Sequence, residues 1–183
     1  MGPIQELASD LGVEERTLRR ATAQGTLRAR RTRPRRLQWA PGEREYLRTH
    51  WHLLAELRGA LRTQREVRLA VIYGSVARGD EDDDSDFDLL ISFGPGRSPA
   101  DSDVVDRVAQ IVNRRVDLAE LRRVESGAPL LLDRVLDEGR VLVDRDGDWA
   151  ELQQRRIAIR ARARRAYRRQ LAGASLAIDE LTR

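Results

Sequence analysis

Short apolar runs alternate with longer segments of helical periodicity through the middle of the chain. Residues 69–73 form an apolar run rich in branched side chains, and residues 85–93 alternate apolar with polar positions. The first pattern predicts a buried strand, and the second predicts a strand whose apolar residues share one face. Residues 115–118, with Val116 and Leu118 alternating with charged residues, and the mostly apolar residues 140–143 predict two further short strands.

Between these strands, apolar residues recur at the three-to-four-residue spacing of amphipathic helices. The spacing predicts a long helix from residue 41 to about 65, helices over 101–113 and 129–137, and a basic terminal helix over 149–170. Gly139 is expected to end the third of these in a left-handed conformation. Helices and strands that alternate in this way indicate an α/β (α+β) fold, in which helices pack on a small mixed sheet.

The first 40 residues follow a different pattern. Residues 4–11 and 14–24 each carry an apolar helical stripe, and Gly12 lies between them, as in a helix-turn-helix. Residues 27–39 alternate around Pro34, which favours a small hairpin of the kind that forms the wing of a winged helix. The expected domains are a helix-turn-helix head at 1–40, a connecting helix at 41–65, a central α/β domain at 66–147 and the basic helix at 148–183.

Composition excludes several kinds of chemistry. The 183-residue chain has no cysteine, so it can form neither a disulfide framework nor a thiolate metal site. Every one of its 34 basic residues is arginine, which excludes lysine-dependent chemistry. No apolar run is long enough to span a membrane, and the first residues lack the apolar core of a signal peptide. We therefore expect a cytoplasmic protein without a membrane partner.

The charge is unevenly distributed. Residues 1–50 carry a net charge of +5, residues 51–147 carry −6, and residues 148–183 carry +5. An acidic centre suits a cation site, whereas basic ends suit a polyanion or an acidic partner. If the head binds DNA, its second helix would present Arg16, Thr17, Arg19 and Arg20 to the major groove, and the hairpin would add Arg30 and Arg31. The hairpin segment could instead be a solvated basic loop, and the two helices a protein-docking module.

Candidate chemistry is concentrated around the second predicted strand. Asp86 and Asp88 lie two residues apart, so both would project from the same face of that strand. Gly74 and Ser75 follow the preceding strand and could bring backbone N–H groups close to a phosphate. Carboxylates of this kind bind Mg²⁺ in metal-assisted phosphoryl transfer. The alternative is an acidic, solvated turn over residues 80–86.

The spacing Gly-Ser, ten residues, Asp-x-Asp resembles the signature of the DNA polymerase beta-like nucleotidyltransferases. The wider string YGSVARGDEDDDSDFDLLI is similar to their minimal (MNT) branch. The resemblance covers about residues 67–143. It implies a nucleoside triphosphate substrate, with ATP the expected one, and two Mg²⁺ ions. It further implies that Asp86, Asp88 and Asp117 are the catalytic and metal-binding residues, that Gly74 and Ser75 hold the triphosphate, and that Arg78 either neutralises phosphate charge or pairs with the acidic loop.

Three functions are compatible with this sequence. The chain could transfer a nucleotide to a partner, as MNT antitoxins do to their HEPN toxins. It could modify a small hydroxylated molecule such as an aminoglycoside, or it could be a DNA-binding regulator that senses nucleotide. The three carboxylates argue against the regulator, and the basic head argues against the small-molecule enzyme. We also expect transfer to survive removal of the head, since Asp86, Asp88 and Asp117 all lie beyond residue 41.

Overall fold

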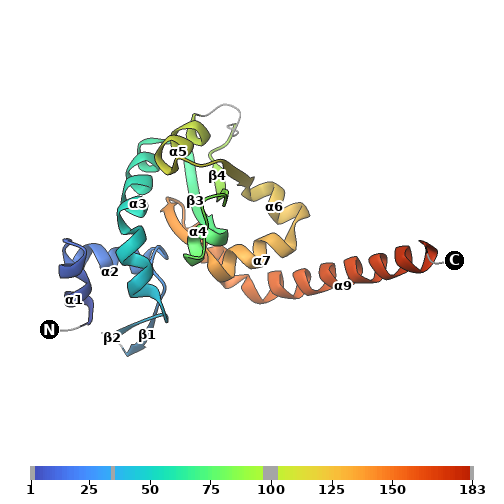
Figure 1. The fold of residues 1–183 in the computed structure, drawn as a ribbon, viewed down its shortest axis with the longest axis horizontal. Coiled ribbons are helices and arrows are strands. Elements are labelled where there is room, and N and C mark those ends of the chain that lie inside the picture. The colour runs from blue at the N-terminus through green and yellow to red at the C-terminus, as the bar shows by residue number, and fades with distance from the viewer. Residues whose placement is uncertain (1–2, 34–35, 97–102, 182–183) are drawn as a thin grey trace.

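A four-stranded mixed sheet forms the centre of the computed structural model, which describes residues 3–33, 36–96 and 103–181 (Figure 1). Its strands are β3 (Val67–Tyr73), β4 (Phe87–Phe93), β5 (Val116–Glu120) and β6 (Arg140–Asp144), in the order β5-β4-β3-β6. Strand β3 is antiparallel to both of its neighbours, whereas β4 and β5 are parallel. No helix in the described residues combines the length and apolarity needed to cross a bilayer.

Helices cover both faces of this sheet (Figure 1). On one face α3 (Glu43–Thr63) and α5 (Val104–Val112) pack over Ile72 and Leu89. On the other face Val71 and Leu90 pack against the second helical layer. That layer contains α6 (Leu121–Gly127), α7 (Pro129–Glu138), α8 (Asp148–Gln154) and α9 (Arg156–Leu181). Alternate residues of the central strands are therefore buried on opposite faces, which explains why residues 69–73 are uniformly apolar.

The first 40 residues pack against this central unit. They form α1 (Pro3–Asp10), α2 (Glu15–Ala23) and an antiparallel hairpin of β1 (Ala29–Arg33) and β2 (Arg36–Trp39). Leu7, Leu18 and Leu27 are buried in the same core as Leu54 of α3 and Ile72 of the sheet. The head, defined here as residues 3–40, thus has no separate apolar core among its described residues.

Hydrogen bonds extend this contact to the edge of the sheet. The Thr26 hydroxyl donates to the Val141 carbonyl at 2.6 Å, and the Val141 N–H donates to the Gly25 carbonyl at 3.1 Å. Arg28 donates through its guanidinium to the carbonyl of Ala77, next to the turn that follows β3. The head is therefore attached directly to β6 and to the β3–β4 connection.

A buried ion pair attaches α3 to the sheet. Glu43, in the first turn of α3, accepts hydrogen bonds of 2.7 and 3.0 Å from the Arg140 guanidinium, and both side chains are almost fully buried. The same guanidinium lies 3.4 Å from the centre of the Tyr46 ring, on which His50 stacks. Nε2 of His50 lies 2.6 Å from a carboxylate oxygen of Glu81 in the acidic loop.

The mixed α/β architecture expected from the sequence is confirmed, with differences in detail. Strand β4 begins at Phe87 rather than at residue 85, and α6 was not expected. The terminal helix is divided at Arg155, because Leu152 of α8 is buried against the sheet layer whereas α9 runs along α7. Gly139 has a φ of −65°, so the left-handed end was wrong. A Cβ there would lie 2.4 Å from the Val135 carbonyl oxygen, which is why the position lacks a side chain.

Candidate active site

The end of β3 brings backbone and carboxylate into very close contact. Gly74 follows Tyr73 directly and begins the short helix α4 (Gly74–Arg78) with a φ of +74°. A Cβ at this position would lie 1.9 Å from Oδ2 of Asp88. Both the backbone angle and the space therefore require glycine. The Gly-Ser turn and the first carboxylate of β4 form one local structure.

Three aspartates lie near this turn. Asp88 and Asp117 belong to strands, whereas Asp86 does not. Asp88 pairs in register with Tyr73 on one side and with Asp117 of β5 on the other. Asp86 lies before β4, so the expected strand alternation does not place it beside Asp88. Burial, then the charge of Asp117, then that of Asp86 raise the pKa of Asp88, while Arg134 opposes them. The carboxylates consequently act on one another electrostatically at one end of the sheet.

The same two carboxylates also affect the neighbouring Tyr73. Burial, followed by the charges of Asp88 and Asp117, raises the pKa of Tyr73 to about 12. Its hydroxyl therefore stays protonated at neutral pH. An anionic, partly buried sheet end is the environment in which a bound cation relieves repulsion most effectively.

The donor chemistry of the three aspartates fits a hard divalent cation, which prefers carboxylate oxygens. The absence of a Cβ at Gly74 also leaves room around Oδ2 of Asp88. Among the residues described, no three Asp, Glu, His or Cys side chains lie where they could together hold a metal ion. The residues therefore fit a metal without forming a ready-made cage.

Glu138, at the end of α7, is the site residue that the sequence did not indicate. Its Oε1 accepts the Gly74 N–H at 2.9 Å, and its Oε2 accepts a hydrogen bond from Arg78 at 2.8 Å. Arg78 also donates to Asp80 at 3.1 Å, and these two hydrogen bonds raise the pKa of its guanidinium. Of the two roles considered for Arg78, pairing with the acidic loop is present in the structure. The sequence shows Glu138 only as an acidic residue next to the apolar stripe of a helix, and this pattern does not indicate which residues it contacts.

The arginines proposed to bind DNA lie on the head. Arg16, Thr17, Arg19 and Arg20 are exposed on α2, where Arg16 pairs with Glu14 and Arg19 with Glu15. Arg30 and Arg31 belong to β1, but their side chains fall outside the part of the structure that is described. Of the residues whose side chains are described, none of the four on α2 contributes to the Gly74–Asp88 turn.

Comparison with known proteins identifies relatives of the central domain. The family described as "Polymerase beta, Nucleotidyltransferase" matches residues 55–148. A candidate protein adenylyltransferase of Methanocaldococcus jannaschii, MJ0435, is 34% identical over 73 residues, which cover 39% of this chain and 75% of that protein. The family match over residues 55–148 includes the Gly-Ser turn and Asp86, Asp88 and Asp117.

Three solved structures also show partial similarity to this chain. A toxin–antitoxin complex with AMP-PNP is 19% identical, with 71% of this chain and 98% of that chain covered and a TM-score of 0.49. The complex of a tri-AMPylated HEPN toxin with its MNT antitoxin from Shewanella oneidensis is 16% identical, with coverages of 71% and 99% and a TM-score of 0.41. A candidate minimal nucleotidyltransferase is 31% identical, with coverages of 52% and 91% and a TM-score of 0.39. All three TM-scores lie below 0.5, so the sequence matches are the stronger evidence.

Proposed function

Because this chain belongs to the polymerase beta nucleotidyltransferase family and is a nucleotidyltransferase, we propose that it transfers AMP from ATP to a hydroxyl group of a partner protein. The observation that carries the proposal is Asp88, held against Gly74 and in register with Asp117. The relative from Methanocaldococcus jannaschii, named as a candidate protein adenylyltransferase, supports AMP as the transferred group and protein as the acceptor.

In this reaction the acceptor oxygen attacks the α-phosphorus of ATP. A new P–O bond forms, the bond from the α-phosphorus to the oxygen that bridges the α- and β-phosphates breaks, and pyrophosphate leaves with that electron pair. Asp117 accepts the hydroxyl proton, which its exposed position allows. Asp86 and Asp88 would hold two Mg²⁺ ions and Asp117 would complete the ligands of one, and the ions would neutralise charge on the phosphate oxygens.

The triphosphate would be held by Gly74 and Ser75, with Arg78 beside them. In the structure the Gly74 N–H and Arg78 are both bound to Glu138. A phosphate oxygen accepts the same hydrogen bonds as a carboxylate oxygen, so ATP would replace Glu138 at these donors. Glu138 thereby satisfies the buried Gly74 N–H when nucleotide is absent.

The test of this function uses ATP labelled with ³²P at either the α- or the γ-phosphate, with Mg²⁺ and a HEPN-type partner protein. Label from the α-position alone should appear on the partner, with one pyrophosphate released per AMP transferred. Label from the γ-position would mean kinase chemistry and would refute the proposal. We use a HEPN-type partner because it is the acceptor that the sequence resemblance implies. If label appeared on another protein and not on this partner, that other protein would be the acceptor.

Asp117 provides the sharper test of mechanism. Asp117→Asn should bind ATP as the wild type does but lower the transfer rate by about 10²–10⁴-fold, because proton removal from the acceptor occurs only in the transition state. Glu120→Gln is the matched control on the same strand, since Glu120 pairs with Arg123 instead. Wild-type turnover in Asp117→Asn would show that Asp117 is not the base.

A second candidate function, DNA binding by the head, is favoured by the exposed arginines of α2 and the net charge of +5 over residues 1–50. Affinity for the protein's own promoter should fall with salt by a slope of about 0.9 per phosphate neutralised. Arg19→Gln should weaken sequence preference if α2 reads bases. No mobility shift at low salt would exclude this function and leave the transferase proposal intact.

A further inference from the structure

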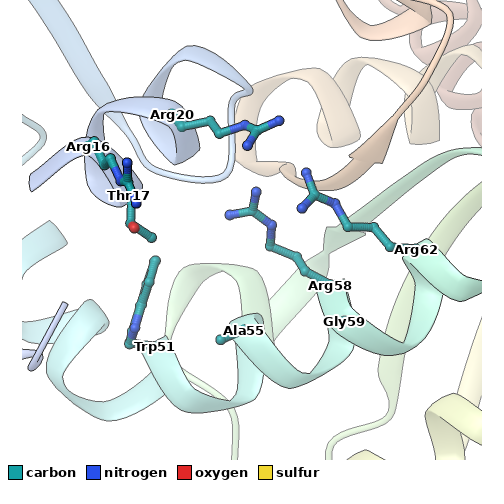
Figure 2. Close-up of a pocket in the computed structure, with 8 residues that line it drawn as sticks. All are labelled: Arg16, Thr17, Arg20, Trp51, Ala55, Arg58, Gly59 and Arg62. Carbon is teal, nitrogen blue, oxygen red and sulfur yellow. The ribbon is translucent and has the colours of Figure 1, made fainter. Parts of the chain in front are cut away.

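A cavity of about 690 Å³ lies between α2 and α3, and all of its charged lining residues are basic. Arg16 and Arg20 come from α2, whereas Arg58 and Arg62 come from α3. Figure 2 shows the guanidinium groups of Arg20, Arg58 and Arg62 pointing into the same space between the two helices. Trp51, almost completely buried, forms part of the apolar wall.

Among the residues described, three of these four cations have no acidic partner, whereas Arg16 pairs with Glu14. In the part of the chain that the structure describes, Arg20, Arg58 and Arg62 form no ion pair with a carboxylate, and Arg58 donates instead to the neutral Gln24 Oε1 at 2.5 Å. Burial, followed by the charges of Arg62 and Arg20, lowers the pKa of Arg58. The fold thus holds several cations close together without an anion of its own.

We propose that this cavity binds a small anion that carries two or more linked phosphate groups, such as the phosphate chain of a nucleotide or a free oligophosphate. Guanidinium groups form paired, charge-assisted hydrogen bonds with phosphate oxygens, which favours phosphate over a simple halide. The volume lies within the range of small-molecule sites. Linked phosphate groups concentrate several negative charges in a small volume, which matches the converging guanidinium groups. A nucleic-acid backbone instead distributes its charges along its length, so it matches this cavity less well.

This site is separate from the candidate active site. Its lining belongs to α2 and α3, and none of it comes from the sheet end that carries Asp88 and Asp117. A ligand there would contact both helices at once and hold the head against α3. The inference does not depend on the proposed transferase function, because it needs no acceptor, metal or reaction.

The test is calorimetric titration of the full chain with inorganic tripolyphosphate, in EDTA so that no divalent cation is present. Wild type should bind one molecule, and Arg58→Gln and Arg62→Gln should each weaken binding about tenfold or more, the effect of losing a hydrogen bond to a charged group. Arg19→Gln is the matched control, since it removes one charge from α2 outside the cavity and Arg19 pairs with Glu15. Equal affinity in Arg19→Gln and both cavity variants would overturn the proposal.

Thermal melts show whether the variants remain folded. Without anion, Arg58→Gln should melt no lower than wild type, because the substitution removes a repelled cation. Arg62 is exposed on α3, so the fold does not depend on its guanidinium and Arg62→Gln keeps the test decisive if Arg58→Gln fails to fold. Tripolyphosphate should raise the melting temperature of wild type more than that of either variant.

A ligand series identifies the source of the phosphates. Affinity should increase from phosphate to pyrophosphate to tripolyphosphate, and ATP that binds more tightly than tripolyphosphate would assign the cavity to a nucleotide. ATP that binds equally well would assign it to the phosphate chain alone. A 12-base-pair duplex that binds more tightly than every small anion, and loses affinity in Arg58→Gln, would overturn the proposal in favour of a nucleic-acid site.

Discussion

At the scale of single residues, the geometry of the site depends on the absence of a side chain at Gly74. Its φ is +74°, and a Cβ would lie 1.9 Å from Oδ2 of Asp88. Gly74→Ala should therefore lose transfer activity and about 1–3 kcal/mol of stability, because the strained backbone and the carboxylate must both shift. Urea unfolding and pyrophosphate release measure the two effects.

Gly59→Ala is the control for that substitution. Gly59 lies inside α3, and a Cβ there would meet nothing within 4 Å. Alanine should stabilise the helix by about 0.5–1 kcal/mol. If both alanine variants changed stability in the same direction, the special geometry of Gly74 would be refuted.

The environment of Asp88 predicts that its contribution to folding stability changes with pH in the direction opposite to that of a salt-bridged acid. Its pKa is raised by burial and then by Asp117, so ionisation destabilises the folded state. The penalty is absent below the ordinary carboxyl pKa, and it develops as the pH rises towards the folded value. In EDTA, Asp88→Asn should be more stable than wild type at pH 7, and the difference should shrink as the pH falls. Urea titrations at a series of pH values measure it.

Two further measurements complete this experiment. Asp84→Asn, an exposed change in the acidic loop, is the control that removes one negative charge outside β4. Addition of Mg²⁺ should raise the melting temperature of wild type more than that of Asp88→Asn, because a bound cation relieves the repulsion. A wild type that is more stable than Asp88→Asn at pH 7 in EDTA would contradict the electrostatic argument.

At the scale of elements, a buried ion pair reinforces the apolar packing of α3 on β6. Glu43 and Arg140 are 2% and 1% exposed, so removal of either charge leaves the other buried and unpaired. Glu43→Gln should therefore cost about 3–5 kcal/mol of unfolding free energy. Glu45→Gln, in the same turn, should cost less than about 1 kcal/mol because its pair with Arg48 is exposed. Similar losses in both variants, measured by urea unfolding, would contradict the importance of burial.

At the scale of the whole molecule, the contacts of the head argue against the expectation that it can be removed without effect. Leu7, Leu18 and Leu27 are at most 3% exposed and belong to the core shared with α3 and the sheet. Deletion of residues 1–40 should therefore expose this core, lower the melting temperature and reduce transfer. Thermal melts and analytical size exclusion measure the loss.

The matched control is deletion of the last residues of α9. This helix extends away from the rest of the chain in Figure 1, and Leu171 is 51% exposed. A chain that ends at Gln170 should keep the melting temperature of the full chain. If the chain without residues 1–40 melted as the full chain does and kept its activity, the head would be an independent unit after all.

Several features followed from the sequence alone because they depend on neighbours along the chain. Periodicity predicted β3, α3 and α7, since the exposure of successive side chains alternates in a strand and repeats every 3.6 residues in a helix. The Gly-Ser turn and Asp88 were recognised for the same reason, because they lie at a fixed spacing. The alternation argument did not apply to Asp86, because β4 begins only after it.

Other features were decided by tertiary structure, because their partners are far apart in sequence. Glu138 contacts Gly74 across 64 positions, and Glu43 contacts Arg140 across 97. Neither glutamate differs in sequence pattern from an ordinary acid on a helix, so nothing local names its partner. The arginine cavity forms because Leu18 and Leu54 are buried in one core, which brings two basic helix faces together. The sequence determined which elements form, and packing determined which of their charges meet, because electrostatic contacts depend on distance in space and not along the chain.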